Sequence, residues 1–177
     1  MTAMDGPTPS RLAELIDRQE LSDVLYRYAA GLDARDWVLW RSAFVTDVPI
    51  TFDMRSVSGR EPKPQTVDAV ISWLQLQFAG FDATQHMITN HRHTIDPGGD
   101  TARVLAHMRA EHWIDPAELP DGDGDRYTMF GYYDDRFVRT ATGWKLVQVQ
   151  LKLTRTEGNP GVMTAAWRKG KRLAAVD

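Results

Sequence analysis

The chain has 177 residues, enough for one domain with a hydrophobic core of its own. Its net charge of −3 provides no basic excess to attract nucleic acid or an anionic membrane surface, so neither is expected as a partner. The absence of cysteine excludes disulfides, thiolate nucleophiles and cysteine metal ligands, and it fits a cytoplasmic protein. No apolar run approaches the roughly 20 residues that a membrane-spanning helix needs.

The N-terminal part of the chain is predicted to be mainly helical. Residues 1–9 are polar, contain proline and glycine, and are expected to form a disordered leader rather than a signal peptide. Residues 11–31 predict the first helix, because apolar side chains recur at near-helical spacing between Ser10, a suitable N-cap, and Gly31. A second, short helix is expected over residues 37–44.

The later part of the chain changes to the two-residue period of β-strands. A strand at residues 48–54, a loop at 56–65 and a third helix at 66–78 come before this change. Four long strands are then predicted, at residues 85–95, 102–114, 126–139 and 143–156.

Helices followed by a run of antiparallel strands indicate an α+β domain rather than a parallel α/β sheet. We expect one domain at residues 10–156, with a curved sheet that wraps around the helices as a cone and leaves a pocket at its open mouth. Residues 157–177 are rich in glycine and basic side chains, and this composition favours a frayed C-terminal tail.

Three residues suggest acid–base chemistry. Alternation places His86 and Asn90 on one face of their strand, and Met108 and His112 on one face of the next strand. If both faces line the cone, the two histidines share its pocket with Asp33 at the end of the first helix. Asp33 would fix the tautomer of His86, whose other ring nitrogen would exchange a proton near neutral pH. His112 would supply a second acid or polarise a carbonyl group.

Structural roles for the same residues stay open at this point. A histidine on a half-buried strand is more often a hydrogen-bonded core or surface group than a catalyst. An aspartate at the end of a helix is more often a turn residue than a base.

The sequence around these residues resembles the SnoaL-like, nuclear-transport-factor-2-like superfamily, and within it the scytalone dehydratases. The similar segments are residues 32–37 (Leu-Asp-Ala-Arg-Asp-Trp), residues 84–86 (Thr-Gln-His) and the strand that ends in His112. The resemblance covers about residues 11–156. It implies an α+β cone in which Asp33 pairs with a histidine that removes a proton, and it implies that a C-terminal segment folds over the pocket mouth.

Hydroxyl groups that polarise the substrate in these enzymes are missing at the matching positions. The resemblance places one tyrosine at Leu32 and a second at Phe52 or Met54, and it aligns a serine and an asparagine with Gly131 and Tyr133. The acid–base dyad is therefore predicted to be retained, whereas the substrate is predicted to differ.

Several further residues are predicted to contact the substrate. They are Tyr28, Phe52, Met54, Asn90, Met108 and Tyr133. Tyr28, Tyr132 and Tyr133 are the candidates for the missing hydroxyl groups. His91 and His93 have a spacing that suits a metal, but they are expected on a solvated outer face without a carboxylate in phase, so no metal is predicted.

The leading hypothesis is a cofactor-independent enzyme that acts on a small, mostly apolar carbonyl compound by dehydration or another elimination. One alternative is cyclisation or isomerisation of a polyketide- or terpenoid-like substrate. Another is a non-catalytic small-molecule-binding domain or an accessory subunit of an oxygenase, because fold alone does not separate these functions. A homodimer or homotrimer is expected, because a curved sheet leaves a broad outer face to cover.

Overall fold

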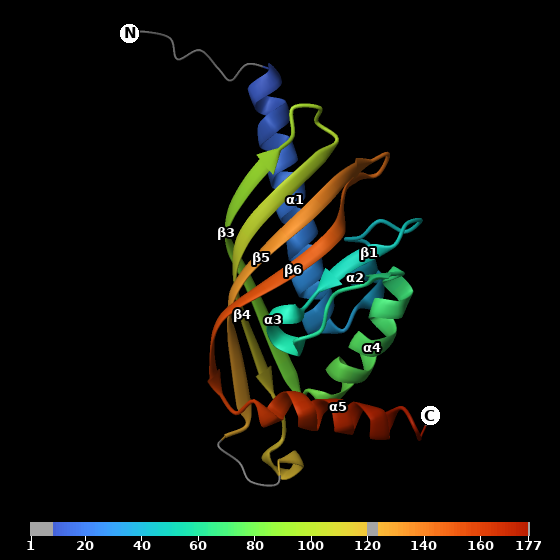
Figure 1. The fold of residues 1–177 in the computed structure, drawn as a ribbon, viewed down its shortest axis with the longest axis vertical. Coiled ribbons are helices and arrows are strands. Elements are labelled where there is room, and N and C mark those ends of the chain that lie inside the picture. Colours follow the sequence, from blue (N-terminus) through green and yellow to red (C-terminus); the bar gives the residue numbers. More distant parts are fainter. Residues whose placement is uncertain (1–8, 120–123, 177) are drawn as a thin grey trace.

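The computed structural model describes residues 9–119 and 124–176, and it confirms the predicted α+β fold. Helices dominate the first part of the chain and long strands the second (Figure 1). The elements are α1 (Pro9–Ala34), α2 (Trp37–Arg41), β1 (Ile50–Asp53), α3 (Arg55–Ser58), β2 (Pro64–Gln65), α4 (Val67–Gly80), β3 (Ala83–Ile95), β4 (Thr101–Trp113), the short 3₁₀ helix η1 (Pro116–Glu118), β5 (Arg126–Thr140), β6 (Gly143–Gly158) and α5 (Gly161–Leu173). Residues 1–8 of the predicted leader lie outside the described residues.

A curved sheet that does not close on itself gives the molecule its cone shape. The strand order is β2-β1-β6-β5-β4-β3, and neighbours are antiparallel except for the parallel pair β1–β6. The long strands β3 to β6 curve along α1, and α5 crosses one end of the cone (Figure 1). β1 is shorter than predicted, and the predicted loop at residues 56–65 contains most of the one-turn helix α3 and all of β2.

Burial along β4 shows which face of the sheet forms the core. The buried residues alternate along the strand, each at most 4% exposed, and are Ala102, Val104, Ala106, Met108, Ala110 and His112. Arg103, His107 and Arg109 lie between them and are exposed on the outer face. The inward phase predicted for Met108 and His112 is therefore confirmed.

The C-terminal end of α1 differs from the prediction in a way that matters for the site. The helix continues past Gly31, so Asp33 lies in its last turn rather than after it. Gly31 serves close packing, because a Cβ there would lie 2.7 Å from the Cβ of Trp40. The helix ends at Arg35 in the left-handed region (φ 56°), and the Arg35 Nε donates to the carbonyl oxygen of Phe78 at 2.9 Å. This contact ties the last turn of α1 to the end of α4.

A β-bulge reverses the inward phase of β3 halfway along the strand. The pairing with β4 shifts within residues 89–92, and Asn90 adopts a φ of 56° there. Beyond the bulge, His91 and His93 face α1, where each places a ring nitrogen 2.9 Å from the Ser22 hydroxyl. The prediction that these two histidines lie on a solvated outer face is wrong, because the bulge inserts a residue into the alternation.

The segment after β6 forms the helix α5, so the prediction of a frayed tail is wrong. α5 packs tightly against α4: a Cβ on Gly80 would lie 1.8 Å from the Ala166 carbonyl oxygen, and a Cβ on Gly170 would lie 1.7 Å from that of Leu76. Val162, Ala165 and Ala166 are buried in the same contact. Glycine at two positions of the seam therefore lets the two helix backbones touch.

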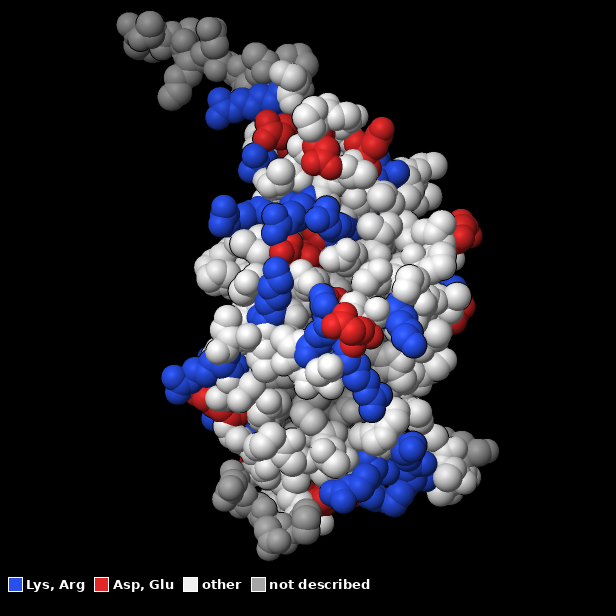
Figure 2. All heavy atoms as spheres, viewed as in Figure 1, with Lys and Arg blue, Asp and Glu red and all other residues white. Residues whose placement is uncertain are grey.

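Basic side chains of α5 gather at one end of the face shown in Figure 2. Two of them form ion pairs, Lys169 with Asp82 and Arg172 with Glu118, each at 2.6 Å. Part of the basic charge of α5 is therefore paired with acidic side chains of the same domain. Among the described residues, no helix has both the length and the apolar character needed to cross a membrane.

Replacing Gly80 with alanine should open the seam between α4 and α5. We expect Gly80→Ala to lower the free energy of unfolding by about 1–3 kcal/mol, because the added methyl group must displace backbone. Gly98→Ala is the matched control, since a Cβ at Gly98 meets no atom within 4 Å. Urea unfolding followed by circular dichroism measures both variants, and equal stability of the two would contradict the packing described.

Candidate functional site

An internal cavity lies between the inner face of the sheet and the helices α1, α4 and α5. Its volume is about 70 Å³. Its lining residues are Tyr28, Leu32, Phe52, Met54, Trp73, Leu74, Gln77, Phe78, Phe81, His86, Met108, Ala110, His112, Met129, Tyr133, Leu151 and Met163. Elements far apart in the chain thus enclose one small, mostly apolar space.

The structure pairs Asp33 with His86 at the wall of this cavity. The His86 Nδ1 lies 2.6 Å from the Asp33 Oδ1, and the His86 side chain is 5% exposed. The backbone N–H of His86 donates to the Asp33 Oδ2 at 2.8 Å, and the Thr84 hydroxyl donates to Oδ1 at 2.8 Å. α1 supplies the carboxylate and β3 supplies all three donors.

These hydrogen bonds set the protonation states of the pair. Burial favours the neutral acid form of Asp33, but the hydrogen bonds from His86 and Thr84 outweigh burial and hold the pKa of Asp33 below its ordinary value. The Asp33 carboxylate can only accept, so the His86 Nδ1 carries a hydrogen. In the neutral ring the His86 Nε2 therefore has a free lone pair, as a general base requires.

His112 shares the cavity with His86 but has a different environment. Its ring is 5.6 Å from that of His86, centroid to centroid, and nearly perpendicular to it. Burial lowers the pKa of His112 to about 3, and the nearby His86 contributes to the shift. The His112 Nδ1 donates to the carbonyl oxygen of Tyr127 at 3.3 Å. At neutral pH His112 is thus an uncharged acceptor, so the predicted role as a second acid does not fit it.

Aromatic and methionine side chains form the wall around the two histidines. Phe78 stacks on His86 with ring centroids 6.0 Å apart, and Phe81 lies 4.9 Å from the His112 ring. The methionines that line the cavity come from four different parts of the chain and are Met54, Met108, Met129 and Met163. Because methionine side chains are flexible and unbranched, this wall can adapt to the shape of a ligand.

Two of the three candidate tyrosines lie at the cavity. Tyr28 and Tyr133 are both 3% exposed, line the space, and pack edge to face with centroids 5.7 Å apart. Burial raises the pKa of both phenols, so both are neutral hydroxyl groups at physiological pH. Tyr132 instead contacts Lys152, whose Nζ is 5.7 Å from its ring centroid, and is not among the lining residues.

The structure brings together all but one of the predicted substrate contacts. Tyr28, Phe52, Met54, Met108 and Tyr133 line the cavity together with His86 and His112. Asn90 does not: it is exposed at the β-bulge, so its prediction as a substrate contact is wrong.

Thr84, Gln77 and Met163 are among the contributors to the site that were not predicted. Thr84 lies on the same face of its strand as His86, so the two-residue alternation could have predicted its place in the site. Gln77 and Met163 carry no such signal, because their position depends on α5 folding back against α4: the Gln77 Nε2 donates to the Met163 carbonyl oxygen at 3.0 Å.

The cluster of Ser22, His91 and His93 does not resemble a metal centre. The Ser22 hydroxyl lies between the two rings, and burial lowers the pKa of both histidines. Within residues 9–119 and 124–176, no group of three or more His, Asp or Glu side chains is arranged to hold a metal ion.

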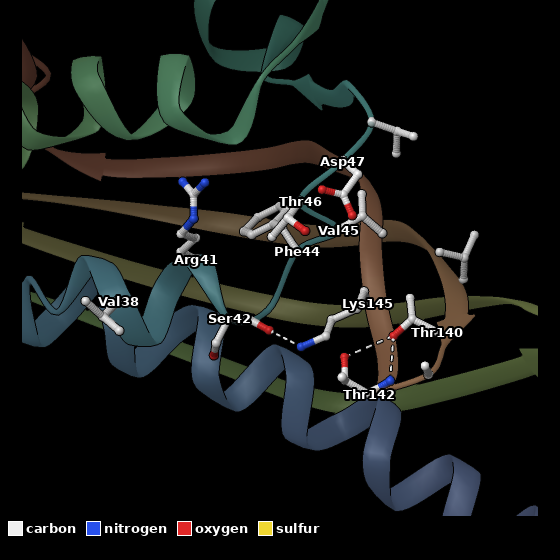
Figure 3. A pocket seen from close by; sticks show the side chains of 13 residues that line it. Val38, Arg41, Ser42, Phe44, Val45, Thr46, Asp47, Thr140, Thr142 and Lys145 are labelled. Carbon is white, nitrogen blue, oxygen red and sulfur yellow. Dashed lines mark hydrogen bonds between the residues drawn. The ribbon is translucent and has the colours of Figure 1, made fainter.

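A larger hollow of about 780 Å³ lies on the outside of the cone, near α2 and the β5–β6 turn (Figure 3). Lys145 points toward Ser42 there, and its Nζ donates to the Ser42 carbonyl oxygen at 2.6 Å. Arg41 is paired with Asp68. No histidine lines this hollow, and its charged side chains do not form an acid–base pair, so the smaller internal cavity is the better candidate site.

Comparison with known proteins gives relatives in both sequence and structure. An uncharacterised protein of Mycobacterium tuberculosis is 30% identical over 141 residues, which span 77% of this chain and 85% of the relative. A crystal structure of a protein from Kribbella flavida is 36% identical, with a TM-score of 0.76, and the match covers 86% of this chain and 98% of that one.

A hexachlorocyclohexane dehydrochlorinase from Novosphingobium barchaimii shares the fold. Its TM-score is 0.66 at 14% identity, and the match covers 85% of this chain and 94% of that one. The sequence profile of the SnoaL-like domain matches residues 13–150. That match spans most of the cone, from the second turn of α1 to β6, and the chain therefore belongs to the SnoaL-like domain family.

Proposed function

We propose that this protein is a lyase that removes water, or another small leaving group, from a carbonyl compound. The observation that carries the proposal is the Asp33–His86 pair, held by a 2.6 Å hydrogen bond at the wall of a mostly apolar cavity. A carboxylate that orients a histidine is the usual way to obtain a general base near neutral pH. The apolar wall keeps bulk water away from the reacting carbon atoms.

In the proposed elimination, the proton that His86 removes from the substrate is the same proton that the leaving group receives. The His86 Nε2 removes a proton from the carbon next to the carbonyl, and the electron pair of that C–H bond forms the new C=C bond. The bond from the next carbon to its hydroxyl group breaks, and the hydroxyl leaves with the bonding pair. The proton on His86 then protonates it, so a β-hydroxy ketone yields an enone and water. Asp33 stabilises the transient imidazolium.

His112 has a separate part in this proposal. Its Nδ1 is engaged by Tyr127, which leaves the Nε2 lone pair to accept a hydrogen bond from the substrate. The hydroxyl that leaves is the natural donor, because its O–H hydrogen stays on the oxygen before and after the C–O bond breaks. His112 therefore positions the leaving group, whereas His86 moves the proton.

One fold neighbour is an example of elimination on this scaffold. A dehydrochlorinase, by its name, removes hydrogen chloride, which is also an elimination, and it shares this fold. Cyclisation or isomerisation would use the same proton removal and would differ in the product. A binding domain would need the cavity but no base.

Replacing either member of the dyad tests the base role. We expect His86→Gln to slow formation of enone from a panel of cyclic β-hydroxy ketones by about 10²–10⁴-fold, the usual contribution of a general base. Asp33→Asn should also slow it, because an amide does not stabilise the imidazolium. Ultraviolet absorbance follows the enone, and NMR in D₂O follows exchange at the carbon next to the carbonyl.

The control for this experiment is His107→Gln, on the exposed outer face of β4. Turnover by His86→Gln at the wild-type rate would contradict the base role. Ketones that bind to the wild-type protein without exchange or turnover would favour a binding domain, and a cyclised product without loss of water would favour a cyclase.

The buried, uncharged His112 should make the protein sensitive to acid. Its pKa is about 3 when folded and about 6.5 when unfolded, so the unfolded chain binds more protons between these values. Stability is therefore lost as pH falls below about 6.5, by about 2 kcal/mol between pH 7 and pH 5 for this residue. His112→Asn, which keeps a donor for Tyr127, should flatten that dependence.

Urea unfolding at a series of pH values measures this effect, with His107→Asn as the matched replacement on the same strand. An unchanged pH slope in His112→Asn would show that His112 is not buried in its neutral form.

A further inference from the structure

We propose that the hollow on the outside of the cone binds a small amphiphilic anion, a molecule with a phosphate or carboxylate head and a short apolar body. Lys145 and Arg27 would hold the head, and apolar side chains of the hollow would cover the body. This site is separate from the internal cavity, so it goes beyond the proposed elimination and does not rest on it. Three features support it: two half-buried cations, the single carbonyl oxygen that they share, and the exposed apolar side chains beside them.

Lys145 and Arg27 differ from the other half-buried basic side chains of this protein. Within residues 9–119 and 124–176, five lysines and arginines are half-buried: Arg27, Arg41, Lys145, Lys152 and Lys169. Three of the five form ion pairs, which are Arg41–Asp68, Lys152–Asp134 and Lys169–Asp82. Lys145 and Arg27 form no ion pair with a described carboxylate, although a charge that is partly removed from water is stabilised by a counter-ion.

The two cations converge on one backbone carbonyl oxygen. The Lys145 Nζ donates to the Ser42 carbonyl oxygen at 2.6 Å, and the Arg27 Nη1 donates to the same oxygen at 3.2 Å. Two positive charges therefore lie side by side, and burial together with the charge of Arg27 lowers the pKa of Lys145. An anion bound beside both groups would offset this repulsion.

A structural role at the end of α2 explains only part of this arrangement. Ser42 is the C-cap of α2, and the carbonyl groups at a helix C-terminus carry about half a negative charge, which favours a nearby cation. That partial charge is smaller than the charge of Lys145 alone and does not neutralise Arg27 as well. Positive charge is therefore left over for a ligand.

Both cations also keep hydrogen-bond donors without an acceptor among the described residues. A lysine ammonium has three donors and an arginine guanidinium has five. Lys145 donates to Ser42 only, and Arg27 uses its Nε and Nη1 but not its Nη2. Charge-assisted hydrogen bonds from such groups are the usual way in which proteins bind phosphate and carboxylate oxygens.

The acidic side chains around the hollow leave this position open. Asp47 lines the same hollow but lies apart from the Lys145 ammonium (Figure 3). Glu20 and Asp23 lie beside Arg27 on the adjoining surface, and within the described part of the chain neither forms an ion pair with it. An anionic head would thus be attracted to Lys145 and repelled from the Asp47 side, which fixes the direction in which the ligand lies.

Exposed apolar side chains provide a surface for the rest of the ligand. Val38 is 82% exposed and Val48 is 52% exposed, and both line the hollow. The lining also includes Phe44, Val45 and Val138. The volume of about 780 Å³ lies in the range of small-molecule sites. An alkyl or aryl group that covers the exposed valines would remove apolar surface from water, which favours binding.

Isothermal titration calorimetry with octyl phosphate and decanoate, each below its micelle concentration, tests the site. Inorganic phosphate supplies the head alone, and 1-octanol supplies the body alone. We expect both amphiphiles to bind at least tenfold more tightly than either fragment, because the contacts of head and body add. Equal binding of inorganic phosphate would contradict the apolar contact, and equal binding of octanol would contradict the ionic contact.

Replacing the cations tests their role in binding the head. Lys145→Gln and Arg27→Gln should each weaken binding of octyl phosphate at least tenfold, the usual scale for a lost hydrogen bond to a charged group, and leave octanol binding unchanged. Lys145→Arg should restore most of the affinity. Lys63→Gln, at an exposed lysine outside the hollow, is the matched control. Thr142→Glu, at an exposed position in the lining, adds a carboxylate near the cations and should abolish binding even if the other variants fold poorly.

The anion site and the proposed base can fail separately in these experiments. His86→Gln should bind octyl phosphate as the wild-type protein does. Unchanged affinity in Lys145→Gln and Arg27→Gln, or no binding by the wild-type protein, would overturn the inference. Loss of affinity in His86→Gln alone would place the amphiphile in the internal cavity instead. Co-sedimentation with phosphatidylglycerol vesicles that depends on Lys145, without binding of octyl phosphate, would replace the single amphiphile by a membrane surface.

Discussion

The site and the cone around it depend on one interaction, the 2.6 Å hydrogen bond between the Asp33 carboxylate and the His86 ring. A carboxylate removed from water is stable only when donors replace its hydration. The His86 ring, the His86 backbone N–H and the Thr84 hydroxyl do so here. Since Asp33 belongs to α1 and the donors belong to β3, the contact that orients the His86 ring also holds the end of α1 against the sheet.

The same cavity gives its two histidines different chemistry. His86 has a carboxylate on its Nδ1, which fixes the orientation of the ring. His112 has only a backbone carbonyl at 3.3 Å and an aromatic neighbour, and burial lowers its pKa to about 3. Two histidines 5.6 Å apart would repel each other if both were charged. The burial of His112 in its neutral form therefore avoids this repulsion.

Much of this architecture could be predicted from the sequence, because it depends on local periodicity. The two-residue alternation placed His86, Met108 and His112 on the inner face, and all three line the cavity. The same rule failed for Asn90 and His91, because a β-bulge adds one residue and inverts the phase beyond it. Nothing in the sequence alone distinguishes the bulge from continued alternation.

The end of α1 and the C-terminal helix could not be predicted for a different reason. By its helix propensity, Gly31 indicates the end of a helix. In the structure it instead allows close packing, because a Cβ at this position would lie 2.7 Å from the Cβ of Trp40. α5 depends likewise on backbone contact at Gly80 and Gly170, which is tertiary information. The positions of the phenol groups also depend on tertiary structure. The resemblance places phenols at Leu32 and in β1. In this structure the phenols at the cavity are instead those of Tyr28, one turn earlier on the same helix face, and of Tyr133 on β5.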